Sequence, residues 1–533
     1  NDFARSPRNL LNAFNKSIKK TEEDLVTPSR KVGDFLVAEN LGDRYYEWKT
    51  LFVPKFVGSD QLVSKSTSVI TGLRGCGKTM VFRRLTGIFD HHLGVVDIEG
   101  ADSFIGFYVN ARSIAEAFPW LPDGKVVEAT GQVVHYFHIC WICELLDWLA
   151  CKYERNDESL SWLVGFFSEY YGDSLKITST NRSAILHLHA FFSKERRRSK
   201  LTSSYKNEAW ELSDYDFLER FCSSIRKNVQ SVGRKDFFFF MDDYSTPMLS
   251  NNVQKILNTI LFRRSPELYF KVATESVESI LLTGLNDKYL EQDDDYILID
   301  WAMEVIQRSS KDNKILVEQL MAPRIEWDSR VSTQSLTVEK ILGKTPYKNT
   351  ELAESLRSEN SNGKVVYHGM QTFCDMWSSS TREMIKTFSQ LLEHININNN
   401  HTGEPLISKE DQNSVLRNAG SKFRALLASA IDPTRQLYEQ DGSTDRAYGE
   451  KLLAIVDAFH EVADYELQNK RSKNQNTNPP KQARRIEITN VTEFVPDDIL
   501  PYYVGMIRYG IFIRDWRGKS VRGKAVPRLI LRG

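Results

Sequence analysis

The sequence has little cysteine, no excess of charge of either sign and no uninterrupted apolar run long enough to cross a membrane. Six cysteines are scattered over 533 residues, which excludes a disulfide-rich scaffold and favours a reducing, cytoplasmic setting. Lysine plus arginine and aspartate plus glutamate each number 70, so net charge indicates no partner, and any nucleic-acid surface must come from local clustering. Residues 1–30 are polar and show no apolar segment of the kind found in secretory signals.

The most apolar stretch, residues 133–150, is interrupted by two histidines and two acids, and it therefore predicts a packed core helix rather than a membrane span. We expect no membrane partner. Cys140 and Cys143 in this stretch have the spacing of a metal or redox pair, but the sequence has no second pair to complete a site. Buried cysteines on a core helix are the favoured interpretation.

Short apolar runs alternate with helical patterns between residues 50 and 300, which is typical of an α/β fold with a parallel sheet. Strands are predicted at residues 68–70, 104–109, 237–241, 269–273 and 296–299. Because these runs are continuously apolar rather than alternating, we expect helices on both faces of the sheet. A helix is predicted at residues 79–88, and the basic stretch 194–200 is predicted as a polar, solvated insertion.

From residue 301 the pattern becomes helical, and strand-like runs return only after residue 509. A helix is predicted at residues 498–509, and strands at 510–514 and 526–531 are joined by a basic turn. Helices followed by a two-stranded basic hairpin are typical of a winged helix. The predicted fold is therefore an α/β core followed by a helical region and a C-terminal winged-helix domain.

A glycine-rich loop follows the first predicted strand and precedes the first predicted helix of the sheet. Its sequence, Gly72-Leu73-Arg74-Gly75-Cys76-Gly77-Lys78-Thr79, fits the G-x-x-x-x-G-K-[S/T] phosphate-binding pattern. Glycines let the backbone curl so that its N–H groups point at an anion, the lysine reaches the β and γ phosphates, and the threonine hydroxyl binds Mg²⁺. The positive end of the helix dipole faces the same anion. The residues predicted to bind the nucleotide here are Gly72, Gly75, Cys76, Gly77, Lys78, Thr79 and Met80.

Two acids, Asp242 and Asp243, follow the most apolar predicted strand. Because α/β sheets bind ligands at the carboxyl ends of their strands, we expect both acids beside the phosphate loop. Asp242 is predicted to hold Mg²⁺ through water, with Thr79 as the other metal-binding residue, and Asp243 to orient or activate the attacking water. Solvated acids at a strand end are the alternative. Thr274, which ends the next predicted strand, is a further catalytic candidate, and an ordinary strand-end threonine is an equally good interpretation.

The phosphate loop, the strand that leads into Asp242 and the strand that ends in Thr274 occur in the order of an AAA+ or STAND ATPase. Ser380-Thr381-Arg382-Glu383-Met384-Ile385 resembles the sensor 2 helix of origin-recognition-type initiator ATPases. With the winged helix, the chain resembles a bacterial origin-recognition-like AAA+ ATPase of the kind found in phage-defence systems. The predicted parts are an N-terminal helical extension (1–44), an α/β P-loop ATPase core (45–300), a helical lid (301–405) and a winged-helix-like domain with a basic hairpin (406–533).

This resemblance implies roles for residues outside the loop. Arg382 would contact the γ-phosphate from the lid, so that the nucleotide state sets the angle between lid and core; a solvated surface arginine is the alternative. Arg263 and Arg264 would be trans-acting fingers in an oligomer, although their place before the sensor 1 strand favours a surface pair. Asp243 stands where a standard AAA+ enzyme has glutamate. Its shorter side chain predicts slow or partner-triggered hydrolysis, as in STAND switches.

Basic side chains cluster in residues 505–533, where Asp515 is the one acid. They are Arg508, Arg514, Arg517, Lys519, Arg522, Lys524, Arg528 and Arg532. Such a cluster around a hairpin, with Trp516 at its tip, predicts contacts to the backbone of duplex DNA, which position a protein without reading sequence. A solvated hairpin, or one that docks a partner protein, is the alternative.

Together these features predict a switch ATPase that uses ATP and Mg²⁺. The paired acids, the lid and Arg382 favour ATP, and no guanine-selecting Asn-Lys-x-Asp stands where a GTPase would need it. The nucleotide state is expected to control assembly into a homo- or hetero-oligomer, or recruitment of DNA or an effector subunit, in anti-phage defence. A replication or plasmid-maintenance initiator and an ATP-stabilised scaffold with negligible turnover are the alternatives.

Overall fold

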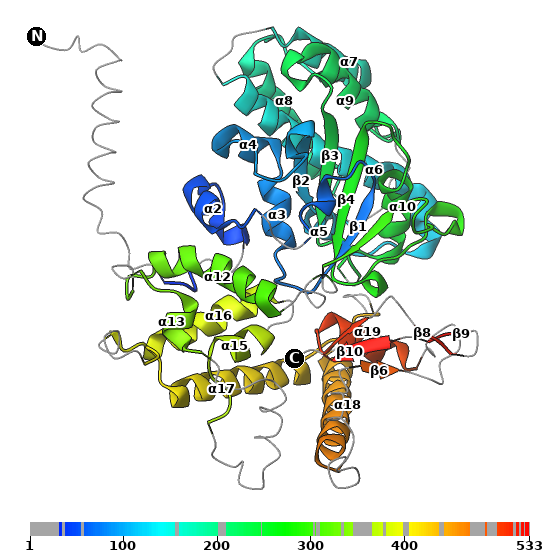
Figure 1. The fold of residues 1–533 in the computed structure, drawn as a ribbon. Coiled ribbons are helices and arrows are strands. Elements are labelled where there is room, and N and C mark those ends of the chain that lie inside the picture. The colour runs from blue at the N-terminus through cyan, green and yellow to red at the C-terminus, as the bar shows by residue number, and fades with distance from the viewer. Residues whose placement is uncertain are drawn as a thin grey trace, which may run out of the picture.

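The computed structural model arranges the chain as an α/β core, a layer of helices below it and a small C-terminal sheet with two helices beside that layer (Figure 1). The described residues are 31–34, 38–54, 58–154, 159–200, 209–246, 248–301, 304, 310–331, 335–344, 365–376, 380–397, 404–435, 442–469, 485–487, 498–514, 519–521, 524–526 and 528–531.

Five parallel strands form the core sheet in the order β2-β3-β4-β1-β5, and all of them lie where the sequence predicts strands. They are β1 (Ser68–Thr71), β2 (Phe104–Asn110), β3 (Asp236–Asp242), β4 (Leu268–Thr274) and β5 (Ile297–Asp300). Asn110 lies opposite Asp242, and Thr71 lies opposite Thr274. Because the strands are parallel, these polar residues share the carboxyl edge of the sheet.

Each face of β3 has its own apolar core, since successive side chains point to opposite faces of a strand. Phe237, Phe239 and Met241 pack in one cluster with the helices on that side of the sheet. Those helices are α6 (Val126–Lys152), α7 (Ser161–Tyr171), α8 (Arg182–Arg198), α9 (Phe217–Asn228) and α10 (Asn251–Leu261). Phe238 and Phe240 pack in a second cluster that continues into the helical layer. Burial on both faces explains the continuous apolar run.

Helix α6 is packed in the core of the protein. Within the described part of the chain, one stretch, Asp123–Lys152, has the length and apolar composition of a spanning helix, but 78% of its most apolar window is buried inside the protein. Cys140 is buried and Cys143 is partly buried on this helix, and neither is in a disulfide. The prediction of a core helix is therefore confirmed.

The helix predicted at residues 79–88 is wrong, because it is two helices. α3 (Lys78–Arg84) ends before α4 (Gly87–Leu93) begins. The bend presses Gly87 against Trp148, and a Cβ at Gly87 would lie 2.8 Å from that ring. A glycine is needed for this close approach, which depends on packing against a distant helix.

The basic stretch 194–200 is also not a solvated insertion. Most of it continues α8, and Glu195 is buried. The guanidinium of Arg196 lies over the Tyr136 ring, 5.5 Å from its centroid. Long arginine side chains can cover apolar surface in this way, which a reading of charge alone misses.

Helices after residue 310 form the lid, and they share the second apolar cluster with one face of the sheet. They are α12 (Ser310–Trp327), α13 (Val338–Leu342), α15 (Met370–Met376), α16 (Thr381–Leu391) and α17 (Lys409–Ala428). In α17, Leu416 packs in the lid cluster and Leu427 in the C-terminal cluster. This helix therefore joins the two parts, and the boundary at residues 405–406 stays a prediction.

The C-terminal part combines α18 (Gly442–Asn469) and α19 (Leu500–Arg508) with antiparallel strands. One sheet has the order β6-β10-β7, and a separate pair joins β8 and β9. The strands are β6 (Arg485–Glu487), β7 (Phe512–Arg514), β8 (Lys519–Val521), β9 (Lys524–Val526) and β10 (Arg528–Leu531). The predicted pairing of the last two strand-like runs is confirmed, with Ile513 opposite Ile530, whereas β6, β8 and β9 were not predicted, and the predicted basic turn holds the β8–β9 pair.

Candidate functional site

The glycine-rich loop between β1 and α3 is shaped by its glycines. Gly75 and Gly77 have φ values of 81° and 101°, which glycine adopts without steric cost. A Cβ on Gly75 would lie 2.6 Å from the Cβ of Arg382, and the Arg382 backbone N–H donates to the Gly75 carbonyl at 3.0 Å. The lid therefore rests directly on the loop.

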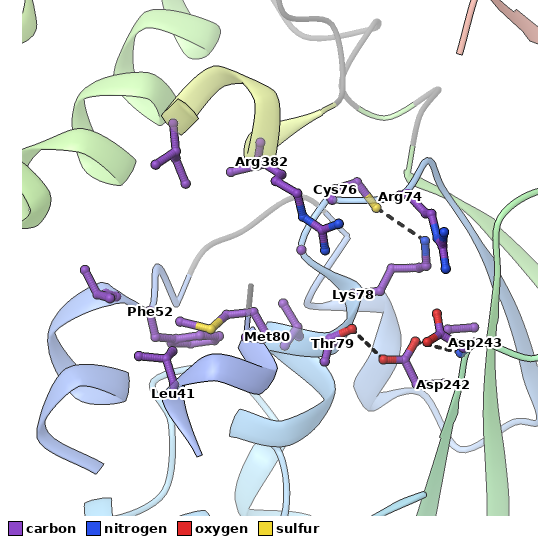
Figure 2. Close-up of a pocket in the computed structure, with 18 of the residues that line it drawn as sticks. Leu41, Phe52, Arg74, Cys76, Lys78, Thr79, Met80, Asp242, Asp243 and Arg382 are labelled. Atoms are coloured by element: carbon purple, nitrogen blue, oxygen red, sulfur yellow. Dashed lines mark hydrogen bonds between the residues drawn. The ribbon is translucent and has the colours of Figure 1, made fainter. Parts of the chain in front are cut away.

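Lys78 lies inside the loop, and its side chain is buried (Figure 2). Its Nζ donates to the Gly72 carbonyl and lies 3.4 Å from the Leu73 carbonyl and 3.6 Å from Cys76 Sγ. All three partners are neutral. A buried cation held by neutral acceptors favours an anionic ligand, which agrees with the predicted phosphate-binding role.

Thr79 and Asp242, the two predicted metal ligands, lie side by side. Thr79 Oγ1 donates to Asp242 Oδ2 at 2.5 Å, and the Tyr108 hydroxyl donates to the same oxygen at 3.2 Å. Burial, and secondly the neighbouring Asp243 carboxylate, raises the pKa of Asp242 to about 6. A bound cation would favour the ionised carboxylate. Hydroxyl and carboxylate oxygens are the ligands that Mg²⁺ prefers, so the pair fits this metal.

Asp243 follows β3 in a left-handed conformation with φ of 55°, which is uncommon for residues other than glycine. Asn110 Nδ2 donates to its Oδ2 at 3.0 Å, and the Asp243 N–H donates to Asp242 Oδ1 at 2.9 Å. These contacts hold the Asp243 carboxylate at the wall of the cavity. Asn110 was not predicted as a site residue, although it ends a buried strand just as Asp242 does.

Thr274 lies at the same edge of the sheet and lines the cavity. It is buried, and its hydroxyl donates to the Ser276 carbonyl at 3.3 Å. The structure therefore brings Thr274 close to the loop, with the hydroxyl bonded within its own turn.

Glu275, which the sequence analysis did not select, connects the loop to the C-terminal part. Its carbonyl accepts from the Gly72 N–H at 3.3 Å. Its carboxylate forms ion pairs with Arg74 Nε at 3.1 Å and Arg508 Nε at 2.7 Å. Arg508 also donates to the Thr246 carbonyl at 3.2 Å. One buried carboxylate thus ties α19 to the phosphate loop.

A cavity of about 490 Å³ lies between the loop, the strand ends and the lid. Its polar side holds Lys78 and the strand-end acids, and its apolar side includes Leu41, Phe52 and Met80 (Figure 2). Leu41 ends a short 3₁₀ helix, and Phe52 follows α2 (Tyr45–Leu51). Leu41 lies within the predicted N-terminal extension (1–44), and its place in the cavity wall was not predicted. A polar and an apolar end, within a volume usual for ligand pockets, suit a nucleotide.

Arg382 reaches the cavity from the start of α16 (Figure 2). Ser380 caps this helix by accepting from the Glu383 N–H at 3.4 Å, so the helix start is fixed against the loop. The Arg382 Nε is buried and has no hydrogen-bond partner within the described ranges. This geometry favours the lid-contact interpretation over a solvated surface arginine.

Other predicted cations lie away from the cavity or point elsewhere. Arg264 is exposed and pairs with Asp294 at 3.6 Å, and neither Arg263 nor Arg264 lines the cavity. The predicted place of Arg508 in the DNA-facing cluster is wrong, because its side chain is 13% exposed and is paired with Glu275. The side chains of the other predicted DNA-contacting residues lie outside the described residues.

His135, Glu195 and Glu211 form the one cluster with metal-ligand spacing found in the described part of the chain. The Leu212 N–H donates to His135 Nδ1 at 3.1 Å, so a neutral His135 carries its proton on Nε2, the nitrogen that faces the acids. Arg198 lies 2.9 Å from both glutamates. A guanidinium already supplies the positive charge between these acids, so an ion-pair network accounts for the cluster.

The fold and the site define a P-loop nucleotide-binding protein with a helical lid over its phosphate loop. The ORC-CDC6-like family model matches residues 38–351 and 338–482, and the chain belongs to this family. The predicted origin-recognition-like AAA+ character is thereby confirmed at the level of the family.

Comparisons with individual proteins add little. No curated protein matches the chain. Among solved structures, the Aeropyrum pernix Orc1 protein in complex with DNA matches 95% of this chain and 94% of its own length, at 13% identity and a TM-score of 0.26. At these values the match carries no conclusion about fold or function.

Proposed function

We propose that the chain is an ATP-binding, slowly hydrolysing AAA+ switch. The observation that carries this proposal is the convergence of Lys78, Thr79 and Asp242 at the polar side of a cavity that also has an apolar wall and a lid arginine. A triphosphate tail with Mg²⁺ fits the polar side, and a purine base fits the apolar side. Membership of the ORC-CDC6-like family supports the same conclusion.

Each residue has a distinct task in this proposal. Lys78 and the N–H groups of the loop bind the phosphates, and Thr79 and Asp242 hold Mg²⁺, which neutralises charge on the phosphate oxygens. Asp243 orients the attacking water. Because Asp243 is one methylene shorter than glutamate and is held by Asn110, we expect slow turnover. The Thr274 side chain completes the part of the site that surrounds the γ-phosphate.

The proposed switch has two outputs. Arg382 reads the γ-phosphate from the lid, whose backbone already contacts Gly75. Glu275 links the loop to Arg508 of α19, so a shift of the loop on nucleotide binding is passed to the C-terminal part. Both connections are direct contacts, and neither needs a long pathway of small displacements.

The C-terminal part is proposed as a winged helix that contacts duplex DNA through the basic residues after Arg508. An effector subunit or further copies of the chain are the other partners that the switch can recruit. In anti-phage defence the closed state would recruit an effector. A replication or plasmid-maintenance initiator would instead need duplex binding that weakens steeply with salt.

Asp243→Ala tests the proposed hydrolysis. We expect this variant to keep its affinity for Mg·ATP and to release phosphate roughly 100-fold more slowly than the wild type. In the control variant Lys78→Ala, we expect both ATP binding and phosphate release to be lost. Unchanged phosphate release in Asp243→Ala would overturn the role of Asp243. A wild type that binds ATP without releasing phosphate would favour the scaffold alternative.

A further inference from the structure

A second lid arginine, Arg324 of α12, lies on the wall of the same cavity. Its residue is 7% exposed. Nη1 donates to the carbonyl of Leu320, one turn earlier in the helix, at 2.6 Å. Its Nε is buried and has no hydrogen-bond partner in the part of the chain that the structure describes. The side chain is therefore a buried donor with unused capacity.

The charge of Arg324 is also uncompensated. Within the described ranges it has no acidic partner, whereas Arg330, beyond the end of the same helix, binds Asp328 through two hydrogen bonds of 2.7 Å and 2.5 Å. Burial lowers the pKa of Arg324 to about 10, which leaves it cationic at neutral pH. A buried cation without a counter-ion is costly, and an anionic ligand in the cavity would remove that cost.

The position of Arg324 indicates which part of the ligand it meets. Trp327, three residues further along α12, stacks on Tyr46 of α2 with ring centroids 6.3 Å apart. α2 leads directly into Phe52 of the apolar wall. This turn of α12 therefore adjoins the apolar side of the cavity, while Lys78 marks the polar side.

We propose that Arg324 is a nucleotide-binding residue that contacts the α-phosphate, which ATP and ADP share. This inference rests on the proposed nucleotide function. The two lid arginines then have different tasks. Arg324 supplies affinity that does not depend on the γ-phosphate, and Arg382 supplies the response to it. The lid is held by either nucleotide, and of the two lid arginines only Arg382 distinguishes ATP from ADP.

Arg324→Met tests this assignment, because it keeps an apolar side chain of similar length and removes the charge. We expect the Kd values for Mg·ATP and Mg·ADP to rise by the same factor, on the order of 10- to 100-fold. Adenosine, which has no phosphate, should bind the variant and the wild type equally. The nucleotide-free variant should melt at the same temperature or higher, because an unpaired buried charge is gone.

Two other variants serve as controls. Arg330→Met removes a paired arginine outside the cavity, and we expect a lower melting temperature with unchanged nucleotide affinities. Arg382→Ala should weaken the affinity for ATP more than the affinity for ADP. All affinities are measured by calorimetry on the full chain.

Three results would contradict either the assignment of Arg324 to the α-phosphate or the proposed nucleotide function. If Arg324→Met loses affinity for ATP but not for ADP, the side chain lies at the γ-phosphate and the assignment is overturned. A lower melting temperature with unchanged affinities shows a structural residue instead. If the wild type binds neither ATP nor ADP, the proposed function fails as well.

Discussion

Lys271 is a charged residue in the middle of β4, and it is fully buried. Its Nζ donates to the carbonyls of Ser64 at 2.6 Å and Ser66 at 2.7 Å, and it lies 4.9 Å from the centroid of the Phe238 ring. These contacts tie the segment before β1 to the sheet, away from the strand ends that line the cavity. Carbonyl oxygens and an aromatic face offset part of the cost of burying the charge.

This lysine predicts a pH-dependent stability. Burial lowers the pKa of Lys271 to about 7, whereas a lysine in an unfolded chain titrates near roughly 10.4. Between these values the unfolded chain binds the extra proton, so the free energy of unfolding rises with pH. We therefore compare the free energy of unfolding of the wild type with that of Lys271→Met, measured by denaturant unfolding. Between about pH 7 and pH 10, the wild type should gain up to about 1.4 kcal/mol over the variant with each pH unit. A difference that is constant with pH contradicts this account.

At the scale of elements, a part-buried ion pair connects α19 to the loop after β4. The side chains of Arg508 and Glu275 are 13% and 7% exposed, so water screens their attraction less than at the surface. A double-mutant cycle with Arg508→Gln and Glu275→Gln should give a coupling energy of about 1–3 kcal/mol in the free energy of unfolding.

The exposed pair of Arg424 in α17 and Asp457 in α18 is the matched control for this cycle. Its coupling energy should be close to zero, because exposed ion pairs contribute little. Equal coupling in the two pairs would show that α19 is not held by Glu275. The same cycle repeated with bound nucleotide would then report whether the loop passes its state to α19.

Features that depend on local sequence could be predicted. The strand ending in Asp242 was found because four phenylalanines in succession need burial on both faces. The loop was found because its residue types are dictated by phosphate chemistry. In both cases neighbouring residues carry the whole signal.

Features that depend on distant packing could not be predicted. The break after α3 arises from contact between Gly87 and Trp148, and β6 exists because β10 pairs with it. Glu275 and Arg508 are ordinary charged residues until the fold places them 2.7 Å apart. The apolar wall at Leu41 and Phe52 likewise becomes part of the cavity only when α2 packs beside the lid.

At the scale of the whole molecule, the cavity lies where three parts of the chain meet. The segment before β1 supplies Leu41 and Phe52 of the apolar wall, the core supplies the loop and the acids, and the lid supplies Arg324 and Arg382. The C-terminal part is connected through Arg508 to a residue that also contacts the loop. A ligand in this cavity therefore touches elements from across the chain, as the proposed switch requires.

The most direct test of the account is a calorimetric titration of the full chain with Mg·ATP, beside Lys78→Ala. We expect saturable binding of about one nucleotide per chain, and an affinity at least roughly tenfold weaker in the variant, because a charge-assisted contact to phosphate is lost. Equal affinities in the two proteins, or no binding by the wild type, would contradict the assignment of this loop as a nucleotide site.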